Sequence, residues 1–84
     1  MAYSRRMTVN STRQLIVPID GSAQEVHFHS GSGKVHLGGS DVTVDNGFEV
    51  DNGEKIVMLV HPGDALYAIT SAGSVTITLL VLAR

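Results

Sequence analysis

The chain has no cysteine. It therefore has neither a disulfide framework nor a thiolate metal site to hold a small fold together. Its 84 residues form one domain at most, and a chain of this length buries only about 60 to 65 per cent of its unfolded surface. We expect stability to come from the core or from association, and we do not expect a large enclosed active site.

Charged and aromatic residues are scarce as well. Charged residues make up 17 per cent of the chain, against roughly 25 per cent in typical soluble proteins, so we expect partners to cover part of the surface. Four aromatic residues are too few for a stacking platform, which argues against nucleic acid as a partner. No apolar run has the roughly 18 residues of a membrane span, and the N-terminus lacks the continuous apolar stretch that is typical of a secretory signal. We expect no membrane partner and synthesis in the cytoplasm.

The charges that are present are unevenly placed. Arg5, Arg6 and Arg13 lie in the first thirteen residues, which contain no acid, whereas all eight acids lie in the remainder. A basic segment before an acidic body predicts a flexible N-terminal arm, residues 1–12, followed by a single folded domain, residues 13–84. The strand pattern described next predicts that this domain is a β-sandwich. The three arginines are the candidate partner contacts of this arm; the alternative is a merely solvated chain end.

Apolar residues recur with period two, and turn residues separate them at short intervals. This pattern predicts an all-β protein of seven to eight short antiparallel strands, with no helix. A small sandwich or barrel is the expected closure, because a single sheet would leave one face and two edges open. The pattern does not choose between the two.

The last expected strand, residues 75–82, changes character along its length. One face is apolar throughout, while the other begins with Thr76 and Thr78 and becomes apolar at Leu80 and Leu82. Alternation breaks in this way where a strand is covered on both sides. Leu80 and Leu82 are therefore candidate partner or oligomer contacts, unless the end of the chain lies under a loop.

Histidines supply the one cluster with chemical potential. His27 and His29 share a strand face, and a hairpin through residues 30–33 would bring His36 beside them. This spacing resembles the paired histidines of a cupin metal site. However, no glutamate follows within the frame of a cupin motif, and cupins are longer. We expect no cofactor and no catalytic residue, and we keep a cupin-like metal site at His27, His29 and His36, or a carbohydrate- or ligand-binding module, as alternatives.

Four stretches carry a resemblance to a known family, and they read VHLGGSDVT (35–43), NGF (46–48), NGE (52–54) and PGDALYAIT (62–70). Their order of strands and turns resembles that of the small β-sandwich virion proteins of tailed bacteriophages, over about residues 13 to 82. None of the four contains a chemical signature.

The resemblance implies a non-enzymatic viral structural protein, most simply a capsid decoration protein. Such a protein would bind the lattice of the major capsid protein or another virion protein, as a trimer or dimer, and would stiffen the shell. It would be located in the virion after synthesis in the bacterial host cytoplasm. The N-terminal arm could add a strand to a capsid edge. Head, tail and neck locations stay open.

Overall fold

The computed structural model describes residues 2–83, and eight strands form within them. They are β1 (Ala2–Val9), β2 (Gln14–Val17), β3 (Gln24–Ser30), β4 (Val35–Gly38), β5 (Phe48–Val50), β6 (Lys55–Val60), β7 (Leu66–Ile69) and β8 (Val75–Ala83). The prediction of an all-β fold with seven to eight strands is confirmed. No helix long and apolar enough to cross a membrane occurs in the described residues.

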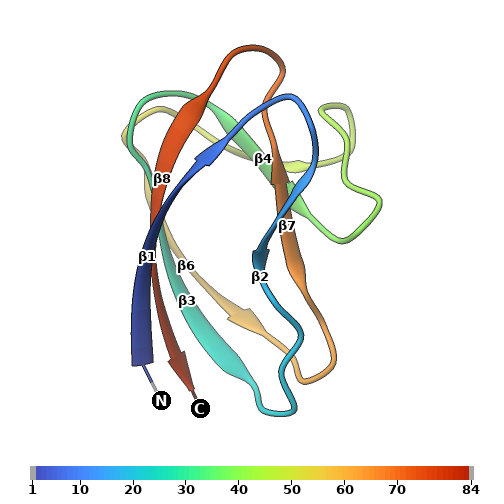
Figure 1. The fold of residues 1–84 in the computed structure, drawn as a ribbon, viewed down its shortest axis with the longest axis vertical. Helices are drawn as coiled ribbons and strands as arrows, with labels where there is room; N and C mark the ends of the chain where they lie inside the picture. The colour runs from blue at the N-terminus through green and yellow to red at the C-terminus, as the bar shows by residue number, and fades with distance from the viewer. Residues whose placement is uncertain (1, 84) are drawn as a thin grey trace.

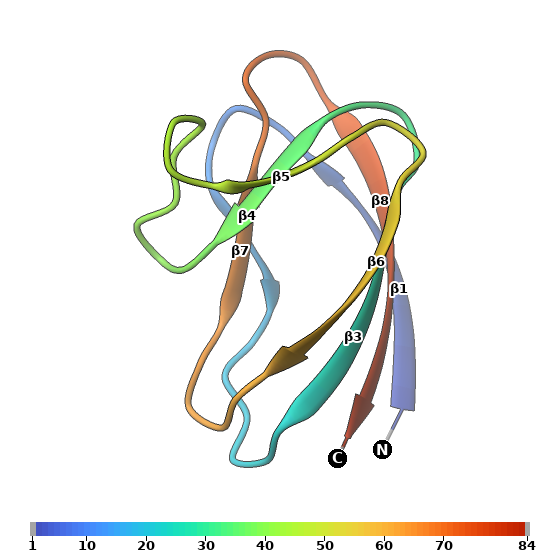
Figure 2. The same cartoon turned by 180° about the vertical axis from the view of Figure 1, so that it is seen from behind.

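The strands form two four-stranded antiparallel sheets that face each other (Figures 1 and 2). Sheet A has the order β1-β8-β3-β6, and sheet B has the order β2-β7-β4-β5. The chain crosses repeatedly from one sheet to the other, as in a jelly roll. Because the two sheets stay separate, the closure is a sandwich and not a barrel.

The core lies between the sheets and follows from the alternation of each strand. In β3 the burial alternates at every residue, so Val26 and Phe28 face inward while His27 and His29 face outward. Sheet B contributes a more continuous apolar set, which includes Ile16, Val17 and Val35. Complete burial of a side chain such as Phe28 stabilises the fold by roughly 1.5 to 3 kcal/mol.

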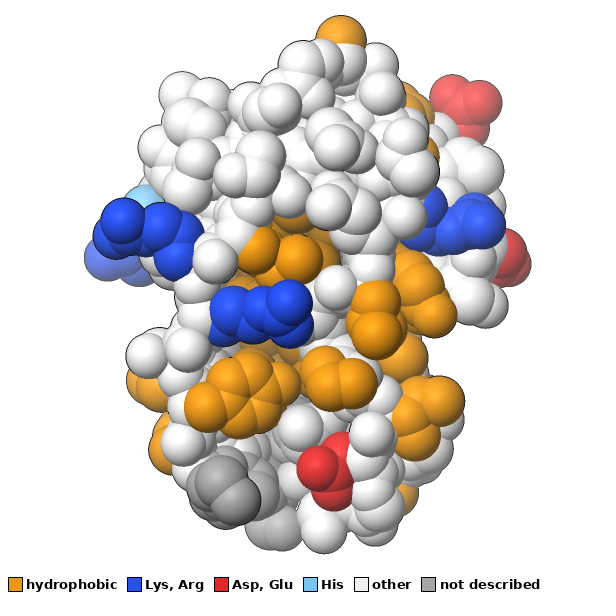
Figure 3. All heavy atoms as spheres, in the orientation of Figure 1, with side chains coloured by type: hydrophobic (Ala, Val, Ile, Leu, Met, Phe, Trp, Pro, Cys, Tyr) orange, Lys and Arg blue, Asp and Glu red, His pale blue; other side chains and the backbone are white. Residues whose placement is uncertain are grey.

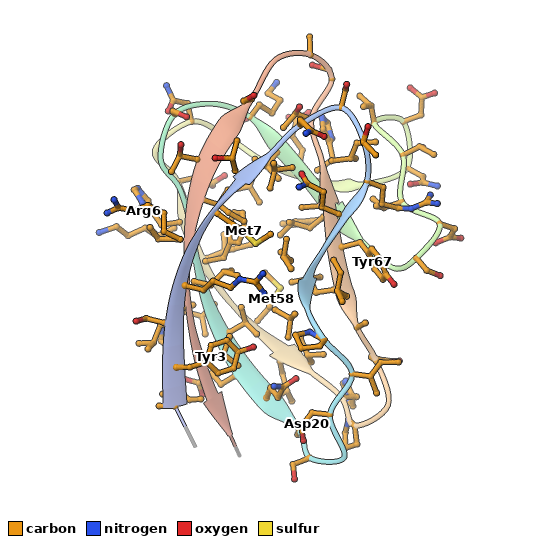
Figure 4. All side chains as sticks on the ribbon, viewed as in Figure 1. Tyr3, Arg6, Met7, Asp20, Met58 and Tyr67 are labelled. Atoms are coloured by element: carbon orange, nitrogen blue, oxygen red, sulfur yellow. The ribbon has the colours of Figure 1, made fainter. Side chains whose placement is uncertain are left out.

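The segment expected to be a flexible arm is instead an edge strand. β1 pairs with β8 over its whole length, from Ala2 opposite Leu82 to Val9 opposite Val75. Figure 4 shows Tyr3 and Met7 pointing between the sheets and Arg6 pointing away from them. An edge strand needs an apolar residue only at every second position, and the polar residues between them gave this segment the composition of a solvated arm.

The expected hairpin through residues 30–33 is also absent, because β3 lies in sheet A and β4 in sheet B. Residues 31–34 cross from one sheet to the other close to the start of β8. The Gly31 amide donates to the carbonyl of Thr76 at 2.9 Å, and a Cβ at Gly31 would lie 2.9 Å from that same oxygen. The glycine therefore permits a close backbone crossing, where the sequence had indicated a tight turn.

Candidate assembly surfaces

The two edge strands of sheet A are the longest edge strands in the described residues. β1 has eight residues and β6 has six, and each pairs with a neighbour on one side only. The edges of sheet B are shorter, with four residues in β2 and three in β5. A free edge presents backbone N–H and C=O groups that can pair with a strand of another chain.

The outer face of sheet A is defined by the register of its four strands. Side chains form three rows across it, from β1 to β6: Ala2–Leu82–Glu25–Leu59, then Ser4–Leu80–His27–Val57, then Arg6–Thr78–His29–Lys55. The first two rows carry the apolar residues. The third row carries the basic ones.

We call Val57, Leu59, Leu80 and Leu82 the sheet A patch. Val57 is 62 per cent exposed, Leu59 50 per cent and Leu80 41 per cent, and Leu82 is half-buried beside them. The first three are half of the large hydrophobic side chains that are exposed in the described chain. Leu80 is thus on the surface and not under a loop. Its contact with a partner stays a prediction, as does that of Leu82.

A hydrogen-bonded pair of side chains lies near the middle of this face. The Nε2 atom of His27 is 2.7 Å from the Oε2 atom of Glu25, two residues earlier on β3, and both side chains are partly exposed. Beside the pair is a shallow hollow of about 410 Å³, lined mainly by His27, His29, Val57, Leu80 and neighbouring residues. The hollow is open to solvent and has the form of a contact surface.

The three histidines of the metal alternative do not come together. His27 and His29 face outward on sheet A, whereas His36 is buried on sheet B beneath the loop of residues 39–47, close to Gly47. The described residues hold no group of three or more side chains suited to bind a metal ion. The hypothesis depended on a hairpin through residues 30–33, and it is wrong because that connection joins different sheets.

The three arginines of the expected arm have separate environments. Arg6 points outward from sheet A (Figure 4), while Arg5 is an exposed residue on the same side of β1 as Tyr3 and Met7. Arg13 precedes β2, and its Nη1 atom donates to the carbonyl of Val42 at 3.4 Å, which ties down the 39–47 loop. The partner contacts assigned to these arginines stay predictions.

The sandwich is open along both of its sides. Apolar side chains are visible in the opening between β1 and β2 in Figure 3. On the other side, an apolar groove of about 440 Å³ runs between β6 and sheet B, lined mainly by Leu37, Phe48, Ile56, Met58 and Leu66. Phe48 is 65 per cent exposed there, and its ring is the feature that a ligand-binding module would use.

Sequence reasoning missed the outward residues of β6. Five apolar residues follow one another from Ile56 to Val60, which is the same loss of alternation that singled out Leu80 and Leu82. Applied to β6, that signal would have identified Val57 and Leu59.

Comparisons with known proteins give a structural likeness and no match of sequence. No protein-family model and no curated protein matches the chain. Among solved structures, the fold is similar to a chain of the Bacillus endospore appendages, which are described as a novel family of disulfide-linked pili. The TM-score is 0.64 and the sequence identity 16 per cent, over 96 per cent of this chain and 82 per cent of the other. At this identity the likeness concerns the fold.

This likeness corrects the interpretation as a phage virion protein. The matching structure belongs to a bacterial spore appendage, so the capsid decoration function and the virion location are wrong, and nothing supports the major capsid protein as a partner. The quoted stretches consist of alternating strands and Gly- or Asn-containing turns. Any small sandwich needs these features, so they do not distinguish one family of sandwiches from another.

Proposed function

We propose that this protein is a non-enzymatic structural subunit that polymerises with copies of itself into a pilus-like fibre, located in a surface appendage. The observation that carries the proposal is the pair of long free edges at opposite sides of sheet A. The similar fold of a subunit from disulfide-linked pili supports it. The shallow, open hollows of the described surface also suit contacts between proteins better than catalysis.

The strand directions in sheet A fit head-to-tail addition. Each strand is antiparallel to its neighbour, and the sheet has four, so β1 and β6 run in opposite directions. The β6 edge of one copy can therefore pair antiparallel with β1 of the next while both copies keep the same face outward. Such a contact joins two different surfaces, so it propagates as an open chain unless rotation closes it.

Side chains favour this pairing over a dimer made through β1. In such a dimer, two antiparallel β1 strands would pair about a two-fold axis perpendicular to the sheet. Residues directly opposite each other must point to the same face, so the two registers with the greatest overlap place Arg5 opposite Arg5 or Arg6 opposite Arg6. Like charges directly opposite each other destabilise a strand pair. A centred β6–β1 register instead places Arg6 opposite Val57 and Lys55 opposite Thr8, and no two like charges are opposed.

A peptide cap tests the proposal without changing the protein. The full chain in native buffer is expected to form fibres on electron microscopy grids, with a sedimenting mass that grows with concentration. An excess of the β1 peptide, AYSRRMTV, should occupy β6 edges and shorten the fibres. A scrambled peptide of the same composition is the control. A species of one fixed, small mass at all concentrations would contradict the proposal.

A further inference from the structure

We infer that the outer face of sheet A is a second self-association surface, on which two copies pack face to face about a two-fold axis that runs along the Ser4–Leu80–His27–Val57 row. This inference rests on the proposed function and deepens it, because the face would join two fibres side by side while the edges of sheet A build each one. The occupant is a second copy of this chain.

The composition of the face suits a protein contact. The sheet A patch lies on β6 and β8, on either side of β3, and its three exposed members have exposed fractions of 41 to 62 per cent. Clustered apolar side chains with polar neighbours are typical of interaction surfaces. The rows add Arg6, His29 and Lys55 at one end of the face and Glu25 at the other. The face therefore has one basic row and two rows in which apolar side chains surround the His27–Glu25 pair.

The order of these rows selects the axis. Rotation about the middle row places the first row of one copy over the third row of the other, so that Glu25 meets His29 twice, once from each copy. In the middle row each residue meets its own copy, so Leu80 meets Leu80 and Val57 meets Val57, and the polar Ser4 and His27 do the same. The carboxylate then gains a hydrogen-bond donor from the second copy, and the apolar side chains bury one another.

The other in-plane axis, parallel to the strands, is less favourable. This axis places each row of one copy over the same row of the other copy, but it places β1 of one copy over β6 of the other. Arg6 would then lie over Lys55, and Glu25 would lie over Leu82. Two cations would oppose each other, and a carboxylate would lose water to an apolar side chain. The axis along the row also places a charge over an apolar side chain, because Lys55 lies over Leu59. It opposes no two lysine or arginine side chains, however, and it adds the two Glu25–His29 contacts, so charge complementarity favours it.

The size of the face sets its strength. Four strands about 4.8 Å apart and three rows about 7 Å apart make a face smaller than the roughly 800 Å² per partner that a stable isolated dimer buries. A single face-to-face contact should therefore be weak. Along a fibre the same contact repeats at every subunit, and repeated weak contacts give firm lateral association.

A charge exchange between copies tests the contact. Glu25→Lys replaces the carboxylate opposite His29 with a cation, and His29→Glu places two carboxylates opposite each other. Each variant alone should associate through this face about tenfold more weakly than the unchanged protein. In an equimolar mixture, the new lysine of one variant would meet the new glutamate of the other, and the unchanged His29 and Glu25 would also meet, so association should return.

The two residues are four apart on β3, which separates them by about 13 Å along an extended strand and prevents direct contact within one chain. Recovery in the mixture therefore requires contact between copies. Glu49→Lys and His61→Glu make the same charge changes at exposed positions outside the three rows and should leave association unchanged. Both test variants change partly exposed side chains, and their thermal midpoints check that each is folded.

Two measurements separate this inference from the proposed function. In the first, fibres of the two variants are grown separately and then mixed, and an increase in fibre width on electron microscopy grids shows lateral pairing. In the second, the β1 peptide blocks fibre growth in concentrated protein, and sedimentation equilibrium detects face-to-face dimers. Fibres that form but show no recovery on mixing would overturn the inference alone. Recovery by sedimentation in the absence of any fibre would support the face contact and contradict the proposed function.

Discussion

Leu79 and Leu80 are neighbours in sequence with the same side chain and opposite surroundings. Leu79 is 3 per cent exposed between the sheets, and Leu80 is 41 per cent exposed on the outer face of sheet A. At the scale of single residues, this alternation is what the sequence predicts best. A period of two is enough to assign a side of the strand, but it does not say whether solvent or another chain covers the outer side.

The pair supplies a matched test of burial. Leu79→Ala should lower the free energy of unfolding by roughly 2 to 5 kcal/mol, because it leaves a cavity in the core, whereas Leu80→Ala should lower it by less than about 1 kcal/mol. Urea unfolding of dilute, unassociated protein measures both. Equal losses would mean that Leu80 is packed within its own subunit.

Glycine packing gives a second residue-scale prediction. A Cβ at Gly47 would lie 2.6 Å from the Cβ atom of His36 and 3.0 Å from the carbonyl oxygen of Thr43. Gly47→Ala should therefore displace the 39–47 loop and cost roughly 1 to 3 kcal/mol, which corresponds to several degrees in thermal midpoint. Gly21→Ala is the control, because nothing lies within 4 Å of its added Cβ. An unchanged midpoint for the Gly47 variant would show that the loop is not packed on His36.

At the scale of elements, the strands were predictable and their partners were not. Alternation identified the strands around Val26, Val35 and Ile77, whereas the polar residues of β1 concealed an edge strand. The histidine hypothesis failed at this scale, since the sequence of residues 30–33 fits a hairpin as well as a crossing. Pairing depends on contacts between residues far apart in the chain, and a turn sequence constrains only local geometry.

Removal of β1 tests its place in the sheet. Val9 is fully buried, and Tyr3 and Met7 pack against the core, so deletion of residues 1–9 should remove several kcal/mol from a total that is typically only about 5 to 15 kcal/mol. We expect loss of the cooperative thermal transition in circular dichroism, and its recovery when the β1 peptide is added. A truncated protein that unfolds like the full chain would agree with the flexible arm expected from the sequence.

At the scale of the whole molecule, the absence of cysteine separates this protein from the pili whose subunit it resembles in fold. Those pili are described as disulfide-linked, and no such link can form through these 84 residues. The sequence predicted this chemistry in full, because a missing residue type needs no structure to interpret. The contacts between copies could not be predicted in the same way, since no periodicity in one chain encodes the position of another.

Fibres of this protein should therefore come apart without a reducing agent. We expect concentrated guanidinium to dissociate them to monomers equally with and without dithiothreitol, because a chain without cysteine can form no disulfide between copies. Sedimentation of treated samples measures this. Fibres that persist in the denaturant would indicate a covalent link of another kind.

The register of the outer rows also determines whether two paired fibres are parallel or antiparallel. Growth from β6 to β1 makes a fibre polar, with unlike ends, and its direction runs along the rows. The two-fold axis along the middle row leaves that direction unchanged, because it places β1 over β1 and β6 over β6. Fibres joined by the inferred face contact would therefore be parallel, so two of the proposed fibres that grow in the same direction could pair along their whole length.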